Sequence, residues 1–215
     1  MTRLVLIRHG EAQVALDGII AGEEHCRGLS DHGRRQAAAL RDRLKETGEL
    51  GDVGALYAST VPRARETAEI IAPALGHLDI RLERELREFD AGEGHGLTWE
   101  QFDERYPRPA TFDPHTLRAP GGETWAAFAE RVERALGRIV RDHPDQTVVV
   151  ACHGGVIEQS FHLWGVSAVQ GLHIDIRNTG ITEFHWTDVW PWHQPSEPTW
   201  RLVRHNDAAH LVGLV

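Results

Sequence analysis

The sequence predicts an α/β protein, a three-layer α/β/α sandwich built around a mostly parallel sheet. Short apolar runs that are typical of buried strands alternate with longer stretches that are typical of helices. Turn residues end the apolar runs. No internal repeat, low-complexity tract or linker interrupts this pattern. We therefore expect a single domain over residues 1–215.

The first strand and the first helix lie near the N-terminus. Residues 3–7 (RLVLI) form a short apolar run that ends before Gly10, which predicts a buried strand. Residues 29–46 are rich in alanine and leucine, and Ser30 or Asp31 can cap the start of a helix there.

A second strand and two further helices follow. Residues 54–59 (GALYAS) predict another buried strand, and Pro62 fits the first turn of a helix over residues 63–75. A short helix is expected over residues 98–106, before a proline-rich loop.

The longest predicted helix covers residues 121–143. Its apolar residues recur at three- and four-residue spacing, so that they share one face of the helix. We expect this face to pack in the core. Its members are Trp125, Phe128, Val132, Leu136 and Ile139.

The most apolar strand is predicted over residues 146–153 (QTVVVACH). Two glycines then turn the chain into a helix that runs to about Trp164. Late strands are expected over residues 181–186 and 199–205, joined by a proline-rich loop.

Composition and charge exclude several classes of partner. The net charge of −9 argues against nucleic acid and against an anionic membrane surface. No apolar run approaches the roughly 18 residues of a membrane span, and the first strand begins too close to Met1 for a signal peptide. Cys26 and Cys152 lie outside any C-x-x-C pair, so we expect two buried free thiols. Cytoplasmic residence is the expectation.

Basic residues gather where several predicted strands end. In open α/β sheets, ligands bind beyond the carboxyl ends of the strands. Arg8 and His9 end the first strand, Arg63 follows Ser59 and the second strand, and His153 ends the most apolar strand. Two arginines and two histidines at one rim repel one another unless an anion neutralises them. Phosphate fits, because arginine binds tetrahedral oxyanions with paired donors.

Glycines and carboxylates complete this candidate site. Gly10 and Gly154 follow the two histidines and would let the backbone approach a bound group closely. Glu85, Glu88 and Asp90 lie between the basic segments. Histidine is a nucleophile toward phosphorus, and its ordinary pKa of about 6.5 leaves a neutral nitrogen near physiological pH. A carboxyl group can protonate the leaving oxygen and later activate water.

The order of these motifs resembles the histidine phosphatase superfamily, in its phosphoglycerate mutase-like branch. R-H-G alone is weak, but R-H-G, S-x-x-x-R-A-x-x-T and a late H-G-G in this order are specific. The similar segments cover nearly the whole chain: LIRHGE (6–11), LSDHGRRQA (29–37), STVPRARETA (59–68), LREFDAGEGHGLTWE (86–100), PGGETWAAFAERV (120–132), VVVACHGGVI (148–157), NTGITEF (178–184) and a weaker LVRHNDAAHL (202–211).

The resemblance implies a role for each candidate residue. His9 would be the nucleophile that becomes phosphorylated, and Glu88 would be the proton donor and later the base. The residues expected to bind the phosphoryl group are Arg8, Gly10, Arg63, His153 and Gly154. Of these, the two arginines and the histidine would also stabilise the developing charge. The family needs no metal or other cofactor, and no compact set of ligand residues in the sequence argues otherwise.

Four positions depart from the family pattern. Ala12 and Ala15 replace the hydroxyl residue and the asparagine of R-H-G-E-[ST]-x-x-N. That asparagine commonly helps to hold the phosphoryl group, so one contact is missing or comes from elsewhere. Gly94 and His95 stand where an aromatic and an acidic residue are usual. His95 either faces the substrate or is a plain loop residue, and the sequence leaves both interpretations open.

The resemblance implies a phosphatase that hydrolyses small phosphomonoesters, with a small phosphorylated metabolite as its partner. The alternatives are a phosphoglycerate mutase, which returns the phosphoryl group to a bound sugar acid, and a non-enzymatic phospho-ligand binder. Mutases of the family carry a longer insertion after the L-x-E segment, whereas residues 97–120 are few and rich in proline. This favours the phosphatase, but leaves its substrate open.

Tryptophans crowd the predicted late hairpin and its loop. The simpler interpretation is that they cover the edge of the sheet. The alternative is a subunit contact in a homodimer or a wall of the substrate pocket. They are Trp186, Trp190, Trp192 and Trp200.

Overall fold

The computed structural model describes residues 1–163, 174–187 and 199–214. Its centre is a sheet with the strand order β3-β2-β4-β1-β5-β6. The strands are β1 (Thr2–Arg8), β2 (Val53–Ser59), β3 (Ile80–Glu83), β4 (Thr147–Cys152), β5 (Ile181–Thr187) and β6 (Thr199–Asp207). Strand β1 pairs in parallel with β4, which pairs in parallel with β2, and β2 with β3. Strand β5 runs antiparallel to both of its neighbours, β1 and β6, and all other pairs are parallel. The prediction of a mostly parallel sheet is confirmed.

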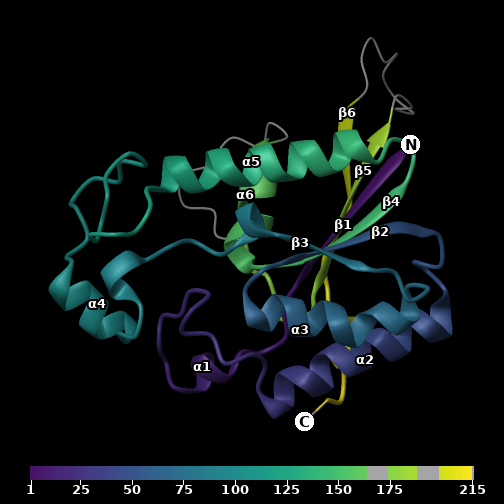
Figure 1. Ribbon diagram of the computed structural model, residues 1–215, viewed down its shortest axis with the longest axis horizontal. Coiled ribbons are helices and arrows are strands. Elements are labelled where there is room, and N and C mark those ends of the chain that lie inside the picture. The colour runs from purple at the N-terminus through teal and green to yellow at the C-terminus, as the bar shows by residue number, and fades with distance from the viewer. Residues whose placement is uncertain (164–173, 188–198, 215) are drawn as a thin grey trace.

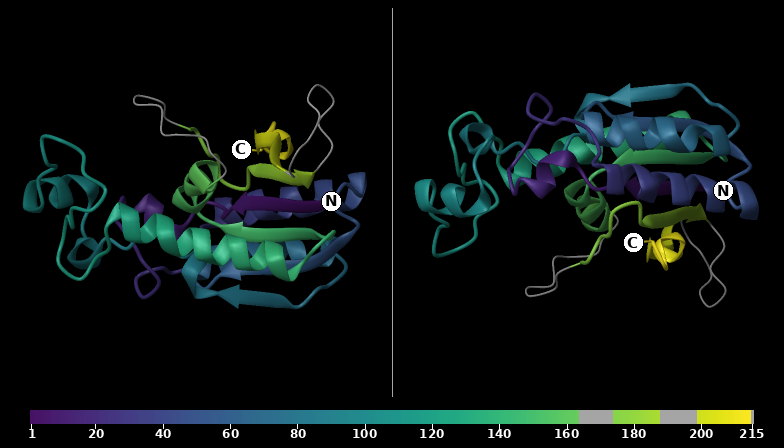
Figure 2. Two further views of the ribbon diagram at one scale, coloured as in Figure 1. Left: turned by 90° about the horizontal axis from the view of Figure 1, so that it is seen from above. Right: turned by 90° about the horizontal axis from the view of Figure 1, so that it is seen from below.

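Helices cover both faces of the sheet and make three layers. The helices are α1 (Gln13–Leu16), α2 (Asp31–Thr47), α3 (Pro62–Ile71), α4 (Trp99–Arg105), α5 (Trp125–Asp142) and α6 (Gly154–Leu163). Helices α2 and α3 lie on one face, and α5 and α6 lie on the other (Figures 1 and 2). Each interface holds its own apolar core, because alternate residues of the buried strands point to opposite faces.

The helix boundaries follow local capping. Ser30 caps α2 by accepting a hydrogen bond from the backbone N–H of Gly33, and the helix ends at Gly48 in the left-handed conformation. Helix α5 begins at Trp125 instead of residue 121, because Thr124 caps it. Gly121 has a φ of +72°, which a helix cannot include.

The predicted apolar face of α5 is confirmed except at its first residue. Phe128, Val132, Leu136 and Ile139 are buried, as expected. Trp125 is 38% exposed, so its assignment to the core is wrong. It lies in the first turn, where the helix extends past the sheet, and it stacks on Phe89 with 4.6 Å between ring centroids.

Two elements had no counterpart in the sequence prediction. Strand β3 is the edge strand next to β2, and its sequence IRLE lacks the apolar run of a buried strand. Helix α1 is four residues long and has no side-chain cap. Edge strands and single-turn helices bury little apolar surface, so they leave a weak sequence signal.

The described tryptophans of the late hairpin lie far from the candidate site. Trp186 pairs with Thr2 at the start of β1, whereas His9 follows the end of that strand. The ring centroids of Trp186 and Trp200 lie 5.3 Å apart, and both rings line a groove of about 380 Å³ next to α5. The substrate-wall interpretation is therefore wrong for these two tryptophans. Trp190 and Trp192, the loop around them and the predicted helix end at Trp164 lie outside the described residues.

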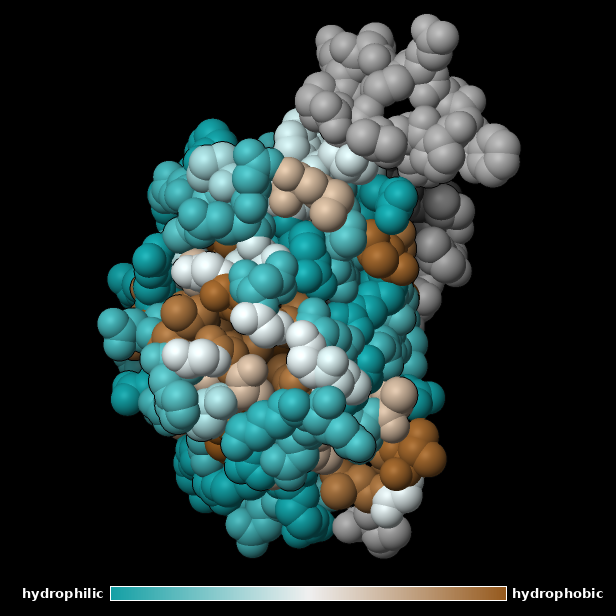
Figure 3. Space-filling view, turned by 90° about the vertical axis from the view of Figure 1, so that its right-hand side faces the viewer, coloured by the Kyte–Doolittle hydropathy of each residue, from teal (hydrophilic) through white to brown (hydrophobic). Residues whose placement is uncertain are grey.

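The molecular surface on the side of the N-terminus carries both apolar and polar side chains. Figure 3 shows the side on which the N-terminus lies, where apolar side chains gather in the middle of a hydrophilic surround. Among the described helices, none is both long and apolar enough to cross a membrane.

Candidate active site

The candidate residues meet at the carboxyl ends of β1 and β4. These strands are parallel neighbours, and their register pairs Arg8 with Cys152. The residues that follow, His9 and His153, are therefore side by side, with 5.1 Å between ring centroids. Arg63 reaches them from the first turn of α3. The predicted proximity of His9 to Arg63 and His153 is confirmed.

Hydrogen bonds fix the tautomer of His9. Its Nε2 accepts a hydrogen bond from Arg63 Nε at 3.0 Å, and a guanidinium can only donate. Its Nδ1 lies 2.6 Å from the carbonyl oxygen of Gly10, which can only accept. The imidazole is therefore neutral, with the proton on Nδ1 and the lone pair on Nε2. The Nε2 lone pair is therefore available at the position where the sequence analysis expects the nucleophile.

Burial and neighbouring cations keep both histidines neutral. The exposed fractions are 7% for His9, 6% for Arg63 and 0% for His153. Burial, followed by the positive charges of Arg63 and Arg8, holds the pKa of His9 well below its usual range. Burial, then Arg63 and His9, lowers the pKa of His153 in the same way. Neutral imidazole is thus the stable form of both rings at neutral pH.

These shifts predict that the protein loses stability in mild acid. In the unfolded chain the two histidines take up protons as the pH falls below about 6.5, but in the folded protein they do not. The free energy of unfolding should therefore fall with pH below about 6.5, at up to roughly 1.4 kcal/mol per pH unit for each histidine. Urea unfolding of the wild type and of His9→Asn between about pH 7.5 and 5 measures this.

The unfolding free energy should fall less steeply with pH in His9→Asn, because this variant lacks one of the two histidines that take up a proton on unfolding. The matched control is His115→Asn, which replaces an exposed histidine. In this variant the unfolding free energy should change with pH as it does in the wild type. Identical slopes for all three proteins would contradict the prediction.

Several donors around His9 are buried and unpartnered. Within the described part of the chain, Arg8 Nε and His153 Nδ1 are buried and have no hydrogen-bond partner. Nε2 of His153 lies 2.9 Å from the hydroxyl of Ser59, and Arg63 donates to the carbonyl of Ala21 at 3.0 Å. Buried polar groups without partners are costly. An oxyanion placed against His9 would give these groups partners.

Glu88 is held at the N-terminal end of α6, the helix that follows His153. Its Oε2 accepts a hydrogen bond from the backbone N–H of Gly155 at 3.1 Å, and its Oε1 accepts from Phe89 N at 3.0 Å. A Cβ atom at position 155 would lie 2.3 Å from Glu88 Oε1, so any larger residue there would displace the carboxyl group. The N-terminal end of α6 thereby holds the carboxyl group of Glu88 in place.

The glycines of the candidate site differ in how closely other residues pack against them. Gly10 does need to be glycine, because a Cβ there would lie 2.5 Å from the carbonyl oxygen of Gly33. A Cβ at Gly154 would come no closer than 3.8 Å to any other described residue. The close contact after His153 is therefore at Gly155, whereas the expected approach of the Gly154 backbone to a bound group stays a prediction.

Arg131 is a site residue that the sequence analysis missed. It is buried on α5 and donates to the backbone carbonyls of Glu85, Arg87 and Glu88 at 2.7, 2.7 and 3.0 Å. It also pairs with Glu123 at 2.5 Å. The segment that presents Glu88 is thus fixed to α5. In the sequence, the only sign of this role is that Arg131 stands next to the apolar face of α5.

Two further residues hold the backbone around His9. Thr67 Oγ1 accepts a hydrogen bond from the N–H of Gly10 at 3.1 Å, and Asn178 donates to the carbonyl oxygen of His9 at 2.8 Å. Both residues belong to the motifs quoted above, Thr67 as the last residue of S-x-x-x-R-A-x-x-T. The motifs contain these positions but do not state what they contact.

The other predicted carboxylates, Glu85 and Asp90, have partners different from those of Glu88. Glu85 pairs with Arg134 and Arg138 on α5, at 3.0 and 3.2 Å. Asp90 lies 3.6 Å from His95, with which it lines a neighbouring cavity. Within the described residues, no group of three or more histidine, cysteine, aspartate or glutamate side chains is arranged to hold a metal.

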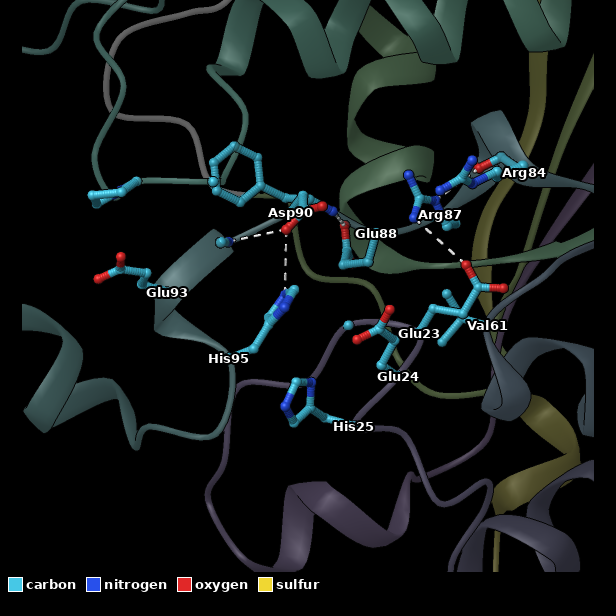
Figure 4. A pocket seen from close by; sticks show the side chains of 15 residues that line it. Glu23, Glu24, His25, Val61, Arg84, Arg87, Glu88, Asp90, Glu93 and His95 are labelled. Atoms are coloured by element: carbon cyan, nitrogen blue, oxygen red, sulfur yellow. Dashed lines mark hydrogen bonds and ion pairs between the residues drawn. The ribbon is translucent and has the colours of Figure 1, made fainter.

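A cavity of about 650 Å³ lies beside the site and shares Glu88 with it (Figure 4). Phe89, Val61 and Pro120 contribute apolar surface, and most of the remaining lining is charged or polar. The charged and titratable lining residues are Glu23, Glu24, His25, Arg84, Arg87, Glu88, Asp90, Glu93 and His95. His95 thus faces a cavity, and the interpretation that it faces the substrate there stays a prediction.

A family model described as the histidine phosphatase superfamily (branch 1) matches residues 4–194. The chain therefore belongs to the histidine phosphatase superfamily. It is an enzyme of this family, and the family expected from the motif order is confirmed, together with the fold.

Its relatives include mutases and phosphatases. Phosphoglycerate mutase-like protein 4 of Arabidopsis thaliana is 32% identical over 212 residues, covering 97% of this chain and 86% of the relative. A 2,3-bisphosphoglycerate-dependent phosphoglycerate mutase of Bartonella henselae is 30% identical over 183 residues, covering 79% and 82%. A solved mycobacterial glucosyl-3-phosphoglycerate phosphatase has a TM-score of 0.74 at 26% identity, covering 95% and 98%. The chain spans about 50% of the length of three mycobacterial relatives.

Proposed function

We propose that this enzyme is a phosphatase that hydrolyses small-molecule phosphomonoesters through a phosphohistidine on His9. The observation behind the proposal is the unprotonated Nε2 of His9, which lies 3.0 Å from Arg63 Nε beside the unpartnered donors of Arg8 and His153. A nucleophilic nitrogen surrounded by buried cationic and neutral donors suits a phosphoryl group.

In the first step, Nε2 of His9 attacks phosphorus and the bond from phosphorus to the ester oxygen breaks. Glu88, in its protonated form, gives its proton to the leaving oxygen, so that a neutral alcohol departs. Arg8, Arg63 and His153 donate to the phosphoryl oxygens and stabilise the charge that gathers on them. The proton on Nδ1 of His9 stays on that nitrogen and is donated in a hydrogen bond to the carbonyl oxygen of Gly10, which keeps the ring oriented.

In the second step, water attacks phosphorus and the bond between phosphorus and Nε2 breaks. The Glu88 carboxylate accepts a proton from this water, which restores the acid for the next cycle. The electron pair returns to Nε2. The balance is one phosphomonoester and one water consumed, and one alcohol and one inorganic phosphate released. The proposed reaction uses no metal and no other cofactor.

Hydrolysis is favoured over mutase chemistry because of the segment after Glu88. Residues 97–120 form only α4 and a proline-rich loop. A mutase must hold the alcohol product so that the phosphoryl group can return to it, whereas a phosphatase must release it and admit water. The expected partner is accordingly a small phosphorylated metabolite. Cytoplasmic residence and a single domain stay predictions from the sequence.

The test is a screen of phosphorylated metabolites for release of inorganic phosphate, with a chelator present. Phosphate release that persists in the chelator, together with a phosphohistidine trapped by rapid quenching, is the expected result. Mutase turnover of 3-phosphoglycerate that clearly exceeds phosphate release would favour the alternative. Binding of phosphorylated ligands without any turnover would favour the non-enzymatic binder.

A further inference from the structure

The cavity beside Glu88 is the place for the alcohol part of the substrate, if the proposed phosphatase function holds. Gly22 lines it and follows Ala21, whose carbonyl accepts a hydrogen bond from Arg63. Glu88 belongs to both spaces. A phosphomonoester whose phosphoryl group is held by Arg63 and whose ester oxygen faces Glu88 would therefore direct its alcohol part into the cavity.

The charge in this cavity is negative. Five carboxylates line it, against two guanidinium groups. Arg87 pairs with Glu23 at 3.5 Å, and Glu93 pairs with Arg105 at 3.2 Å, so these charges are largely balanced. Glu24 and Asp90 have no arginine or lysine partner among the described residues, and together they outnumber Arg84, which like Glu24 is exposed to solvent. The negative excess persists whether Glu88 is protonated or not.

His95 adds a neutral polar group to this wall. Its ring fits against Gly22, where a Cβ atom would lie 2.5 Å from the ring. Its Nε2 is buried and lacks a hydrogen-bond partner within the described chain; Asp90 is 3.6 Å away. Burial lowers the pKa of His95, so the ring is neutral at neutral pH and accepts or donates a hydrogen bond without charge. Figure 4 shows His95 and Asp90 facing each other across the cavity wall.

We infer that the cavity selects phosphomonoesters whose alcohol carries hydroxyl groups and no carboxylate of its own. The Glu24 and Asp90 carboxylates accept hydrogen bonds from hydroxyls but repel a second negative charge. His95 offers a further hydrogen bond to such a hydroxyl. The volume of about 650 Å³ admits an alcohol as large as a sugar.

Two substrates of nearly equal size test this inference. Glycerol 1-phosphate and 3-phosphoglycerate differ in one group, a hydroxymethyl in place of a carboxylate. The wild type should show a kcat/KM for glycerol 1-phosphate at least about tenfold above that for 3-phosphoglycerate. This ratio should fall at least about threefold in Glu24→Gln and further in Glu24→Lys, because each step removes negative charge from the wall. Using the ratio cancels any general change in activity.

The control is Glu46→Gln, which removes a carboxylate from the exposed end of α2. Its ratio should equal that of the wild type. A wild-type ratio near one, or a ratio that Glu24→Lys leaves unchanged, would overturn the inference. Release of p-nitrophenol from p-nitrophenyl phosphate tests the underlying activity separately. No release from any of the three esters would overturn the proposed function itself, and the inference with it.

Discussion

Replacing His9 with alanine is expected to lower kcat/KM for every phosphomonoester by at least about 1,000-fold. The substitution removes the Nε2 lone pair that forms the bond to phosphorus, and no other described side chain presents a nucleophile at that point. His153 is the nearest alternative, but its Nε2 is engaged with Ser59 at 2.9 Å. Steady-state phosphate release measures the loss.

A second measurement separates this role from simple damage to the site. Rapid quenching of the wild type with labelled substrate should trap phosphate on the protein, and His9→Ala should trap none. The matched control is His115→Ala, which changes an exposed loop histidine and should keep both turnover and label. Thermal unfolding should show that His9→Ala is folded. Normal turnover in a folded His9→Ala protein would exclude His9 as the nucleophile.

The second large effect is expected at Glu88, and it should depend on the leaving group. Glu88→Gln keeps the size and one acceptor oxygen, which can hold one of the two hydrogen bonds from Gly155 and Phe89, but it cannot give a proton. For alkyl phosphates, whose alkoxide is a poor leaving group, kcat/KM should fall about 100- to 10,000-fold. For p-nitrophenyl phosphate, whose phenolate leaves without a proton, the loss should be only a few-fold. Comparing the two esters measures the contribution of the acid.

Two further variants sharpen this test. Glu85→Gln removes a carboxylate from the same segment, but one that pairs with Arg134 and Arg138 instead of facing the site, so both esters should react nearly normally. Gly155→Ala should show the leaving-group signature of Glu88→Gln in milder form, because its methyl group displaces the carboxyl group. An equal loss for both esters in Glu88→Gln would argue against the role of acid.

Local patterns were sufficient for most of the fold. The buried strands and the helices that pack on them left periodic apolar signals, because each must turn one face or both toward a core. The same reasoning failed where little apolar surface is buried, at β3 and α1. It also failed at Trp125, because the periodicity shows which face of a helix is apolar but not how far the helix extends past the sheet.

The proximity of His9, His153 and Arg63 was predictable for a topological reason. His9 and His153 each follow the end of a buried strand, and parallel neighbouring strands end at the same edge of a sheet. Arg63 lies in the first turn of the helix after the next strand, so it reaches the same edge. The motif order added the identity of the family. Neither argument could show that Arg63 Nε donates to His9 Nε2, which decides the tautomer.

The groups that hold Glu88 became visible only in the folded molecule. Arg131 lies 43 residues away in the chain, and Gly155 lies 67 residues away. Their spacing has no periodicity, and each contact depends on how α5 and α6 pack on the sheet. The cavity around His95 is likewise formed by four separate segments.

By itself the sequence determined the layers, the direction of most strands, the family, and which residues stand at the catalytic edge. These depend on the periodicity of apolar residues and on short motifs, both of which are local. The tertiary structure alone decided the protonation of His9, the fixation of Glu88 and the charge of the neighbouring cavity. Those properties depend on distances between atoms that the chain brings together only on folding, and electrostatic interactions and hydrogen bonds change steeply over such distances.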